Sequence, residues 1–160
     1  MTRPYDAAVL GIGSSHGDDS IGWHVVDDLR KQDMAGLLLR ELTNPMNIVD
    51  YLADANQVHV VDAAIGMDQN VSVRRLAYLS ITEQQSIASA TSGGTHGLGL
   101  VQALQLAESL GLPIDHVTVW LARGEAFDSM ADPSATAIES TRRCTKAIVR
   151  QLQLASTVAR

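Results

Sequence analysis

Residues 5–22 read YDAAVLGIGSSHGDDSIG, an apolar segment that runs into a glycine-rich turn and two adjacent carboxylates. Tyr5–Ile12 has the composition of a buried strand. The helix after it is expected to start near Asp18 or Asp19, whose side chains can cap free backbone N–H groups. The apolar residues of that helix recur at a spacing of four, which places them on one face: Ile21, Val25 and Leu29.

The two carboxylates indicate what kind of ligand this turn suits. A turn built for phosphate offers bare backbone N–H groups and the positive end of a helix to an anion. Asp18 and Asp19 would repel such an anion. The turn therefore favours a cation.

Size and charge limit the classes of protein to which the chain can belong. Its 160 residues, 46% hydrophobic and 19% charged, predict one globular domain over residues 1–160. A formal net charge of −6 argues against nucleic acid or an anionic membrane surface as a partner. No apolar segment is long enough to span a membrane and Met1–Asp6 lacks the features of a signal peptide, so a cytoplasmic protein is expected.

Apolar segments rich in β-branched residues alternate with helical patterns along the whole chain. Further strands are expected over residues 37–42, 58–62, 69–79 and 114–121, and further helices over 45–55, 80–88, 98–111 and 134–154. The strand over 69–79 is a candidate edge strand, and residues 91–97 form a glycine-rich loop. The alternation predicts an α/β layer fold with a largely parallel sheet.

Several residues in the last part of the chain predict where helices end and which side chains are buried or exposed. Gly111 is expected to stop the helix over 98–111, and Asp132 with Pro133 is expected to cap the last helix. Cys144, inside that helix, is expected to be a buried hydrophobe and not a nucleophile. Four basic residues of the same helix stand at helical spacing and predict a solvated face, with a docking patch as the alternative: Arg142, Arg143, Lys146 and Arg150.

Three groups of polar residues are expected to meet at one edge of the sheet. Ligands of open α/β sheets bind beyond the carboxyl ends of the strands. Asp18 and Asp19 follow the first strand, Asp62 ends the third, and the loop that holds His96 can fold over the same edge. Two carboxylates and one imidazole form an incomplete ligand set for a divalent transition metal, which leaves positions for water or substrate.

The turn, the strand end and the loop together resemble the hydrogenase maturation proteases, endopeptidases that trim the large subunits of nickel-iron hydrogenases. The matching segments are Gly11-Ile12-Gly13 with Gly17-Asp18-Asp19-Ser20-Ile21-Gly22, Asp54-Ala55 with Val60-Val61-Asp62-Ala63, and Thr95-His96-Gly97-Leu98-Gly99-Leu100. The likeness spans most of the chain. Two departures stand out: the first turn is one residue short, with Ser14 where an Asn is usual, and residues 41–45 replace a Gly-Gly-Thr-like segment.

The resemblance implies a fold, a site and an activity. The fold is a three-layer α/β sandwich with a twisted, mostly parallel sheet of about five strands. The metal and catalytic residues carried over from the family are Asp19, Asp62 and His96. The implied activity is removal of the C-terminal extension of a hydrogenase large-subunit precursor after nickel insertion, with the nickel supplied by the precursor.

Three alternatives use the same residues differently. Gly13-Ser14-Ser15-His16-Gly17 matches the Gly-x-Ser-x-Gly elbow of α/β-hydrolases, with Ser15 as nucleophile, although the elbow follows the first strand and adjoins two carboxylates. Gly11, Gly13 and Gly17 partly match a dinucleotide fingerprint, but the spacing is wrong. A nickel-dependent maturation chaperone that binds the precursor without cutting it would need the same metal ligands.

Overall fold

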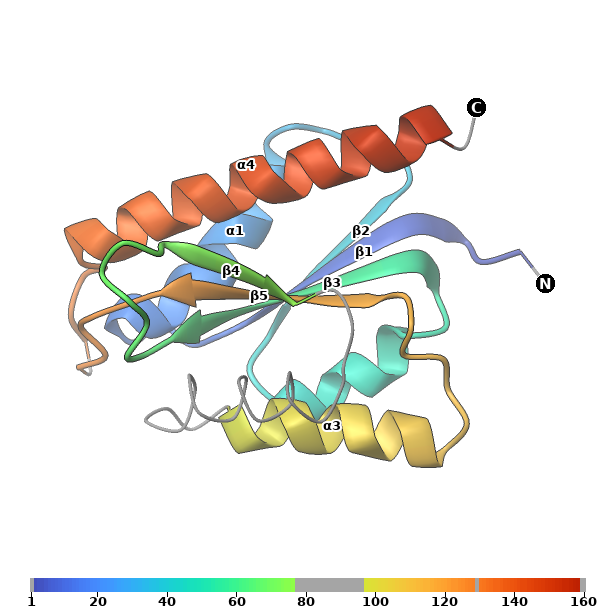
Figure 1. Ribbon diagram of the computed structural model, residues 1–160, viewed down its shortest axis with the longest axis horizontal. Helices are drawn as coiled ribbons and strands as arrows, with labels where there is room; N and C mark the ends of the chain where they lie inside the picture. Colours follow the sequence, from blue (N-terminus) through green and yellow to red (C-terminus); the bar gives the residue numbers. More distant parts are fainter. Residues whose placement is uncertain (1, 77–96, 129, 159–160) are drawn as a thin grey trace.

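The computed structural model describes residues 2–76, 97–128 and 130–158. Within these residues the chain forms a twisted five-stranded sheet between two helical layers (Figure 1). The strand order is β2-β1-β3-β5-β4, and every neighbouring pair is parallel except β4 with β5. The predicted α/β fold, a three-layer sandwich with a mostly parallel sheet, is confirmed.

The strands lie close to the predicted segments. They are β1 (Tyr5–Ile12), β2 (Leu37–Leu42), β3 (Ala55–Ala64), β4 (Val73–Leu76) and β5 (Val117–Arg123). β3 extends beyond the predicted 58–62 at both ends, so Asp62 lies inside the strand, two residues before its end. β4 is shorter than the predicted 69–79, but it is the predicted edge strand. β5 begins and ends later than predicted.

The helices follow the predicted order. They are η1 (Gly17–Ser20), α1 (Ile21–Arg30), η2 (Pro45–Tyr51), α3 (Gly97–Ser109) and α4 (Ala135–Val158), of which η1 and η2 are 3-10 helices. The predicted helix over 80–88 and the loop up to His96 lie outside the described residues. Among the residues that are described, no helix combines the length and the apolar character that crossing a membrane requires.

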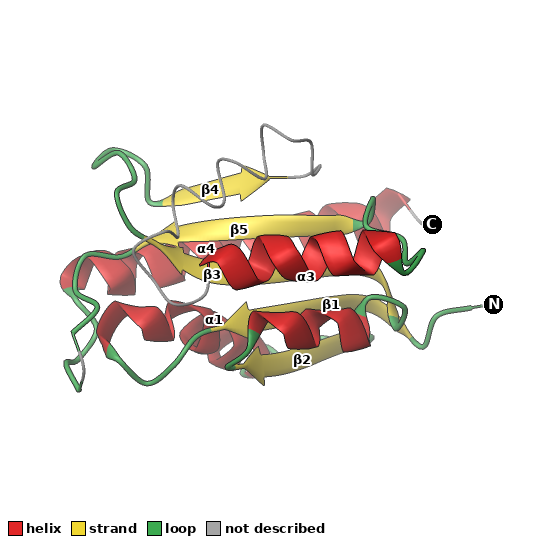
Figure 2. Cartoon of the chain, turned by 90° about the horizontal axis from the view of Figure 1, so that it is seen from below, coloured by secondary structure: helices red, strands yellow, loops and turns green. Residues whose placement is uncertain are grey.

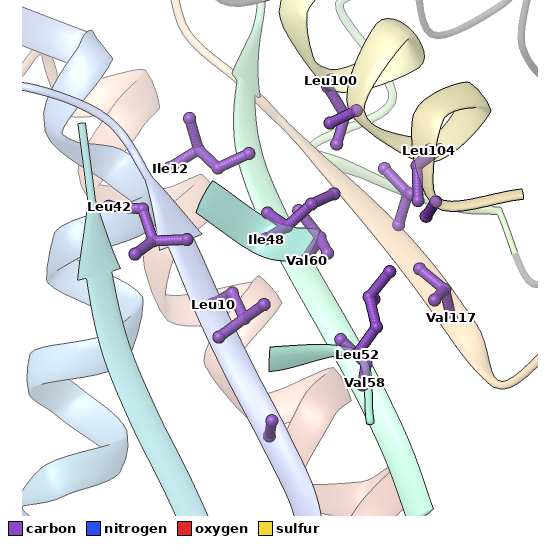
Figure 3. Packing of buried hydrophobic residues seen from close by; sticks show 14 of the residues in the cluster. Leu10, Ile12, Leu42, Ile48, Leu52, Val58, Val60, Leu100, Leu104 and Val117 are labelled. Atoms are coloured by element: carbon purple, nitrogen blue, oxygen red, sulfur yellow. The ribbon is translucent and has the colours of Figure 1, made fainter. Parts of the chain in front are cut away.

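Two helical layers cover the two faces of the sheet (Figures 1 and 2). Side chains alternate between the faces along each strand. On one face Val60 packs with Leu100 and Leu104 of α3 and with residues of η2 (Figure 3). On the other face Val61 packs with residues of α1 and α4.

A close contact between backbones fixes α1 against β1 and β3. A Cβ atom at Gly22 would overlap the carbonyl oxygen of Ile12 and lie 3.0 Å from the carbonyl oxygen of Val61. A Cβ atom at Gly11 would overlap Gly22 in turn. Because neither residue has a side chain, α1 lies directly on the sheet, and this contact holds the preceding turn at the ends of β1 and β3.

Candidate functional site

The candidate site lies at the point where the connections of the sheet reverse direction. From β1 the chain passes through α1 to β2 on one side, and from β2 it returns through η2 to β3 on the other side of β1. β1 and β3 are therefore adjacent parallel strands whose helical connections lie on opposite faces (Figure 2). Such a switch point is the common ligand site of open α/β sheets. Asp19 follows β1, and Asp62 is near the carboxyl end of β3.

Asp18 is buried and holds two distant segments of the chain together. Its Oδ2 accepts hydrogen bonds from the backbone N–H groups of Glu125 (2.7 Å) and Ala126 (2.8 Å) and from the Ser134 hydroxyl (2.6 Å). Its Oδ1 accepts the Ser134 backbone N–H at 2.7 Å. Burial alone would raise the pKa of Asp18, but these donors hold it below its ordinary value. Asp18 is thus an ionised structural residue.

The expectation that Asp18 or Asp19 caps the first helix is wrong. The residue before α1 is Ser20, and its side chain makes no capping hydrogen bond. The Asp18 oxygens are instead taken by donors more than 100 residues further along the chain. A short 3-10 helix, η1, precedes α1 and carries both carboxylates.

Ser134 connects Asp18 to the last helix. Its hydroxyl donates to Asp18 and accepts the backbone N–H of Ala137 at 3.1 Å, so Ser134 caps α4. The prediction that Asp132 and Pro133 form this cap is wrong, because α4 begins at Ala135, after both of them. The network fixes the loop between β5 and α4 against the turn that carries Asp19.

The conformation of Gly17 supports this contact between the turn and the loop. Its φ of +53° is in the left-handed region that favours glycine. A Cβ atom at this position would lie 2.5 Å from the carbonyl oxygen of Ala126. Gly17 therefore allows the loop to approach closely enough for its N–H groups to reach Asp18.

Asp19 differs from Asp18 in exposure and in partners. Its side chain is half-buried, and its Oδ2 accepts the Ser14 hydroxyl at 2.6 Å. The backbone N–H of Ser14 donates to the Asp19 carbonyl oxygen at 3.2 Å, which closes the turn. A carboxylate that is partly accessible can be reached by a cation. Of the two adjacent carboxylates, Asp19 is the better candidate ligand.

Asp62 lies near the carboxyl end of β3, the central strand of the sheet, with 1% of its surface exposed. It is paired with Leu121 of β5 and shares its sheet face with Val60 and Ala64, which is the face covered by η2 and α3. The 3-10 helix that carries Asp19 contacts β3. The structure therefore brings the turn of Asp19 and the strand of Asp62 together at one edge.

His96, the third predicted ligand, lies outside the described residues, so the full ligand set stays a prediction. The next residue, Gly97, begins α3. A Cβ atom on Gly99 would lie 3.1 Å from Pro45 Cγ, and Pro45 begins η2 just beyond the carboxyl end of β2. The start of α3 is thus at the same edge of the sheet as Asp19. Across the three described ranges, no three His, Cys, Asp or Glu side chains are grouped as a metal site would require.

Two other reactive side chains are buried on the opposite face. His59 Nδ1 accepts the Trp120 indole N–H at 3.1 Å, and burial, with a smaller contribution from Arg75, lowers the pKa of His59 to about 4. Burial raises the pKa of the Cys144 thiol to about 12, so it is protonated at neutral pH. Both groups are part of the core, as expected for Cys144.

The sequence did not reveal the hydrogen bonds that distinguish the two adjacent carboxylates. Ser14 and Ser134 are ordinary turn residues by composition. The bond from Ser14 to Asp19 spans five residues, whereas that from Ser134 to Asp18 spans 116 residues. No local sequence pattern predicts a contact between residues 116 positions apart.

No protein-family model matches the sequence, and no curated protein matches it either. Solved structures do match. An endopeptidase from Escherichia coli superposes with a TM-score of 0.74 at 18% identity, over 92% of each chain. The hydrogenase maturating endopeptidase HybD from E. coli has a TM-score of 0.69 at 17% identity, over 92% of each chain.

A third solved structure comes from an archaeon. The [NiFe] hydrogenase maturation protease HybD from Thermococcus kodakarensis superposes with a TM-score of 0.69 at 12% identity, over 92% of this chain and 99% of its own. At such identities the likeness establishes the architecture. The chain has the fold of the hydrogenase maturation proteases, the family that its turn, strand end and loop resemble.

Proposed function

We propose that the protein is an endopeptidase that removes the C-terminal extension of a nickel-iron hydrogenase large-subunit precursor after nickel has been inserted. The observation that carries this proposal is the contact between the 3-10 helix that carries Asp19 and the strand that carries Asp62, at the switch point of the sheet. The shared fold with solved maturation proteases supports the same activity.

Asp19, Asp62 and His96 are the proposed ligands of the nickel that the precursor carries. Carboxylate oxygens and imidazole nitrogens both suit a divalent transition metal. Asp18 is not proposed as a ligand because each of its oxygens already accepts short hydrogen bonds. Three ligands from the enzyme would leave other positions of the ion to the precursor, so recognition would require nickel in place.

The proposed reaction is hydrolysis of one peptide bond. A divalent metal can polarise the scissile carbonyl or lower the pKa of a bound water. The water oxygen attacks the carbonyl carbon, the C–N bond breaks, and the leaving amine takes up a proton. In this proposal Asp19, the more accessible carboxylate, accepts the proton of the attacking water and passes it to the leaving amine.

The test is a processing assay with purified nickel-loaded precursor and single alanine variants. Replacing Asp19, Asp62 or His96 is expected to reduce the rate at least 100-fold, because each would remove one ligand of the ion. Ser15→Ala, which changes an exposed neighbour in the same turn, is the control and should keep the wild-type rate.

The outcomes separate the alternatives. Normal processing by Asp62→Ala would disprove the ligand assignment. Loss of processing in Ser15→Ala, together with labelling of Ser15 by a phosphonate, would favour the serine hydrolase. Binding of the nickel-loaded precursor by the wild type without release of a peptide would favour the nickel-dependent chaperone.

A further inference from the structure

A groove of about 530 Å³ lies between α4 and the segment that leads into β4. Figure 1 shows β4 beside α4, and these two elements are in contact. Val73 and Ala147 supply apolar lining that packs against the core. The remaining lining from α4 is basic and exposed: Arg142, Arg143, Lys146 and Arg150.

This groove is positively charged in a protein whose net charge is −6. Glu139 is the carboxylate that contacts the basic set, with ion pairs of 2.7 Å to Arg142 and to Arg143. Within the described ranges, Lys146 and Arg150 make no ion pair. Within the described ranges, four cations line the groove and one carboxylate, Glu139, is ion-paired with them, so the groove is complementary to an anionic partner.

The spacing of the cations matches an extended peptide. Arg142, Lys146 and Arg150 are four residues apart, so they recur about every 6 Å along α4. Alternate side chains of an extended chain point the same way and recur about every 6.6 Å. The three cations together span about 12 Å, which is the length of about four extended residues. Acidic residues at every second position would therefore each face one cation.

We propose that this groove docks an extended segment of the precursor that carries acidic side chains at alternate positions. This inference rests on the proposed function, and it adds a second contact away from the metal. Arg142 lies eight residues along α4 from Ser134, about 12 Å from the residue that binds Asp18. A peptide segment bound in the groove would extend to the site. A longer polyanion would be repelled by the acidic residues on the rest of the surface.

Charge reversal at Lys146 and Arg150 tests the docking groove. The double variant K146E/R150E is expected to raise the KM for nickel-loaded precursor about tenfold at low salt, with kcat unchanged. The control R30E/R40E makes the same change in net charge at exposed residues of α1 and β2, outside the groove. It should keep the wild-type KM. Wild-type KM should also rise with salt, and KM of K146E/R150E should not.

A binding experiment that needs no processing accompanies the kinetics. The peptide acetyl-Glu-Ala-Glu-Ala-Glu-amide is titrated into the labelled protein, and amide NMR shifts are followed. Shifts at Val73 and Ala147 that vanish in K146E/R150E are expected, with none from the corresponding lysine peptide.

Each outcome decides one of the two proposals. An unchanged KM in K146E/R150E, an equal rise in R30E/R40E, or an absence of peptide shifts at the groove would overturn the docking inference. Shifts caused by a single-stranded 12-mer oligonucleotide but not by the peptide would overturn it as well. If the wild type releases no peptide but binds the precursor through Lys146 and Arg150, the endopeptidase proposal fails and the docking inference stands.

Discussion

At the scale of single residues, two adjacent carboxylates have different environments. Asp18 is fully buried and accepts four hydrogen bonds, whereas Asp19 is half-buried and is held by the Ser14 hydroxyl. A buried carboxylate that satisfies several donors contributes to stability, and a partly accessible one can be reached by a ligand. Asp18 therefore has a structural role, and its neighbour Asp19 has the proposed chemical role.

Asp18→Asn is expected to lower the free energy of unfolding by about 3 kcal/mol at neutral pH, because its amide group would face N–H donors in a buried site. The folded-state pKa of Asp18 lies below its unfolded value, so the unfolded chain binds more protons in the window between them. The contribution of Asp18 to the free energy of unfolding is therefore fully present above about pH 4, and it is lost as the pH falls further. Urea unfolding at several pH values measures both effects.

The matched control is Asp19→Asn, which should cost less than about 1 kcal/mol because Asp19 is not fully buried. The stability difference between wild type and Asp18→Asn should narrow as the pH falls from 5 to 3. An equal loss in both variants, or a difference that does not change with pH, would contradict the structural role of Asp18.

Ser14 is expected to act as a positioning residue for Asp19. Ser14→Ala should lower kcat for processing about tenfold without changing the KM, because removal of a partner that orients a ligand typically costs 10–100-fold. Ser14→Asn, which restores the residue usual in the family and can still donate a hydrogen bond, should recover most of the rate. A rate for Ser14→Ala equal to that of wild type would show that the 2.6 Å hydrogen bond does not orient Asp19.

His59 is expected to stay uncharged at physiological pH. Its pKa is about 4 in the folded protein, against an ordinary value of 6.5, because burial disfavours the charged ring. The unfolded chain then binds more protons between these values, so this contribution to stability falls as the pH drops from 6.5 to 4. NMR titration, with the signal assigned by its loss in His59→Gln, should give a midpoint near 4, and a midpoint near 6.5 would refute the burial argument.

The sequence indicated the two adjacent carboxylates of the turn but could not assign their roles. Both carboxylates stand in one turn, and helix capping was a reasonable expectation for either. The choice between them depends on Glu125, Ala126 and Ser134, which come to the turn only when β5 and α4 are in place. Local patterns carry no information about such a contact.

At the scale of secondary-structure elements, the contact of α1 with the sheet positions the site. Gly22→Ala is expected to destabilise the protein by about 2 kcal/mol or more, because the new methyl group would overlap the backbone carbonyl of Ile12. Backbone cannot move aside as a side chain can. Thermal and urea unfolding would measure the loss.

Gly99→Ala in α3 is the control for this helix substitution. Its methyl group would meet the ring of Pro45 at 3.1 Å, and the gain in helix propensity of about 1 kcal/mol offsets that contact. A change smaller than about 1 kcal/mol is expected. A Gly22→Ala variant as stable as Gly99→Ala would mean that α1 can shift away from β1.

Element order and type were predictable because long periodic patterns determine them, and boundaries were less so. The short helix after β2 was predicted, and Asn44 caps it by accepting the Met46 backbone N–H at 3.0 Å. The predicted start of α4 at residue 134 is one residue early, and its cap was wrong because Ser134, bound to Asp18, replaces Asp132. Tertiary contacts changed these ends without changing the elements.

At the scale of the whole molecule, strand order decides where the site is. Alternation of strands and helices predicted a mostly parallel sheet, and the switch point between β1 and β3 follows from the order β2-β1-β3-β5-β4. The sequence placed Asp19 and Asp62 at this edge, and the structure agrees for both. The roles of Asp19, Asp62 and His96 and the identity of the metal stay predictions, since all of them concern what the edge binds.

The central claim is that these carboxylates recognise nickel inside a precursor and direct its cleavage. The most direct measurement is the intact mass of the precursor, nickel-loaded or nickel-free, after incubation with wild type or with Asp62→Asn. The account predicts a shortened large subunit and a released C-terminal peptide only for the nickel-loaded precursor with wild type. Equal cleavage of the nickel-free precursor, or cleavage by Asp62→Asn at the wild-type rate, would contradict it.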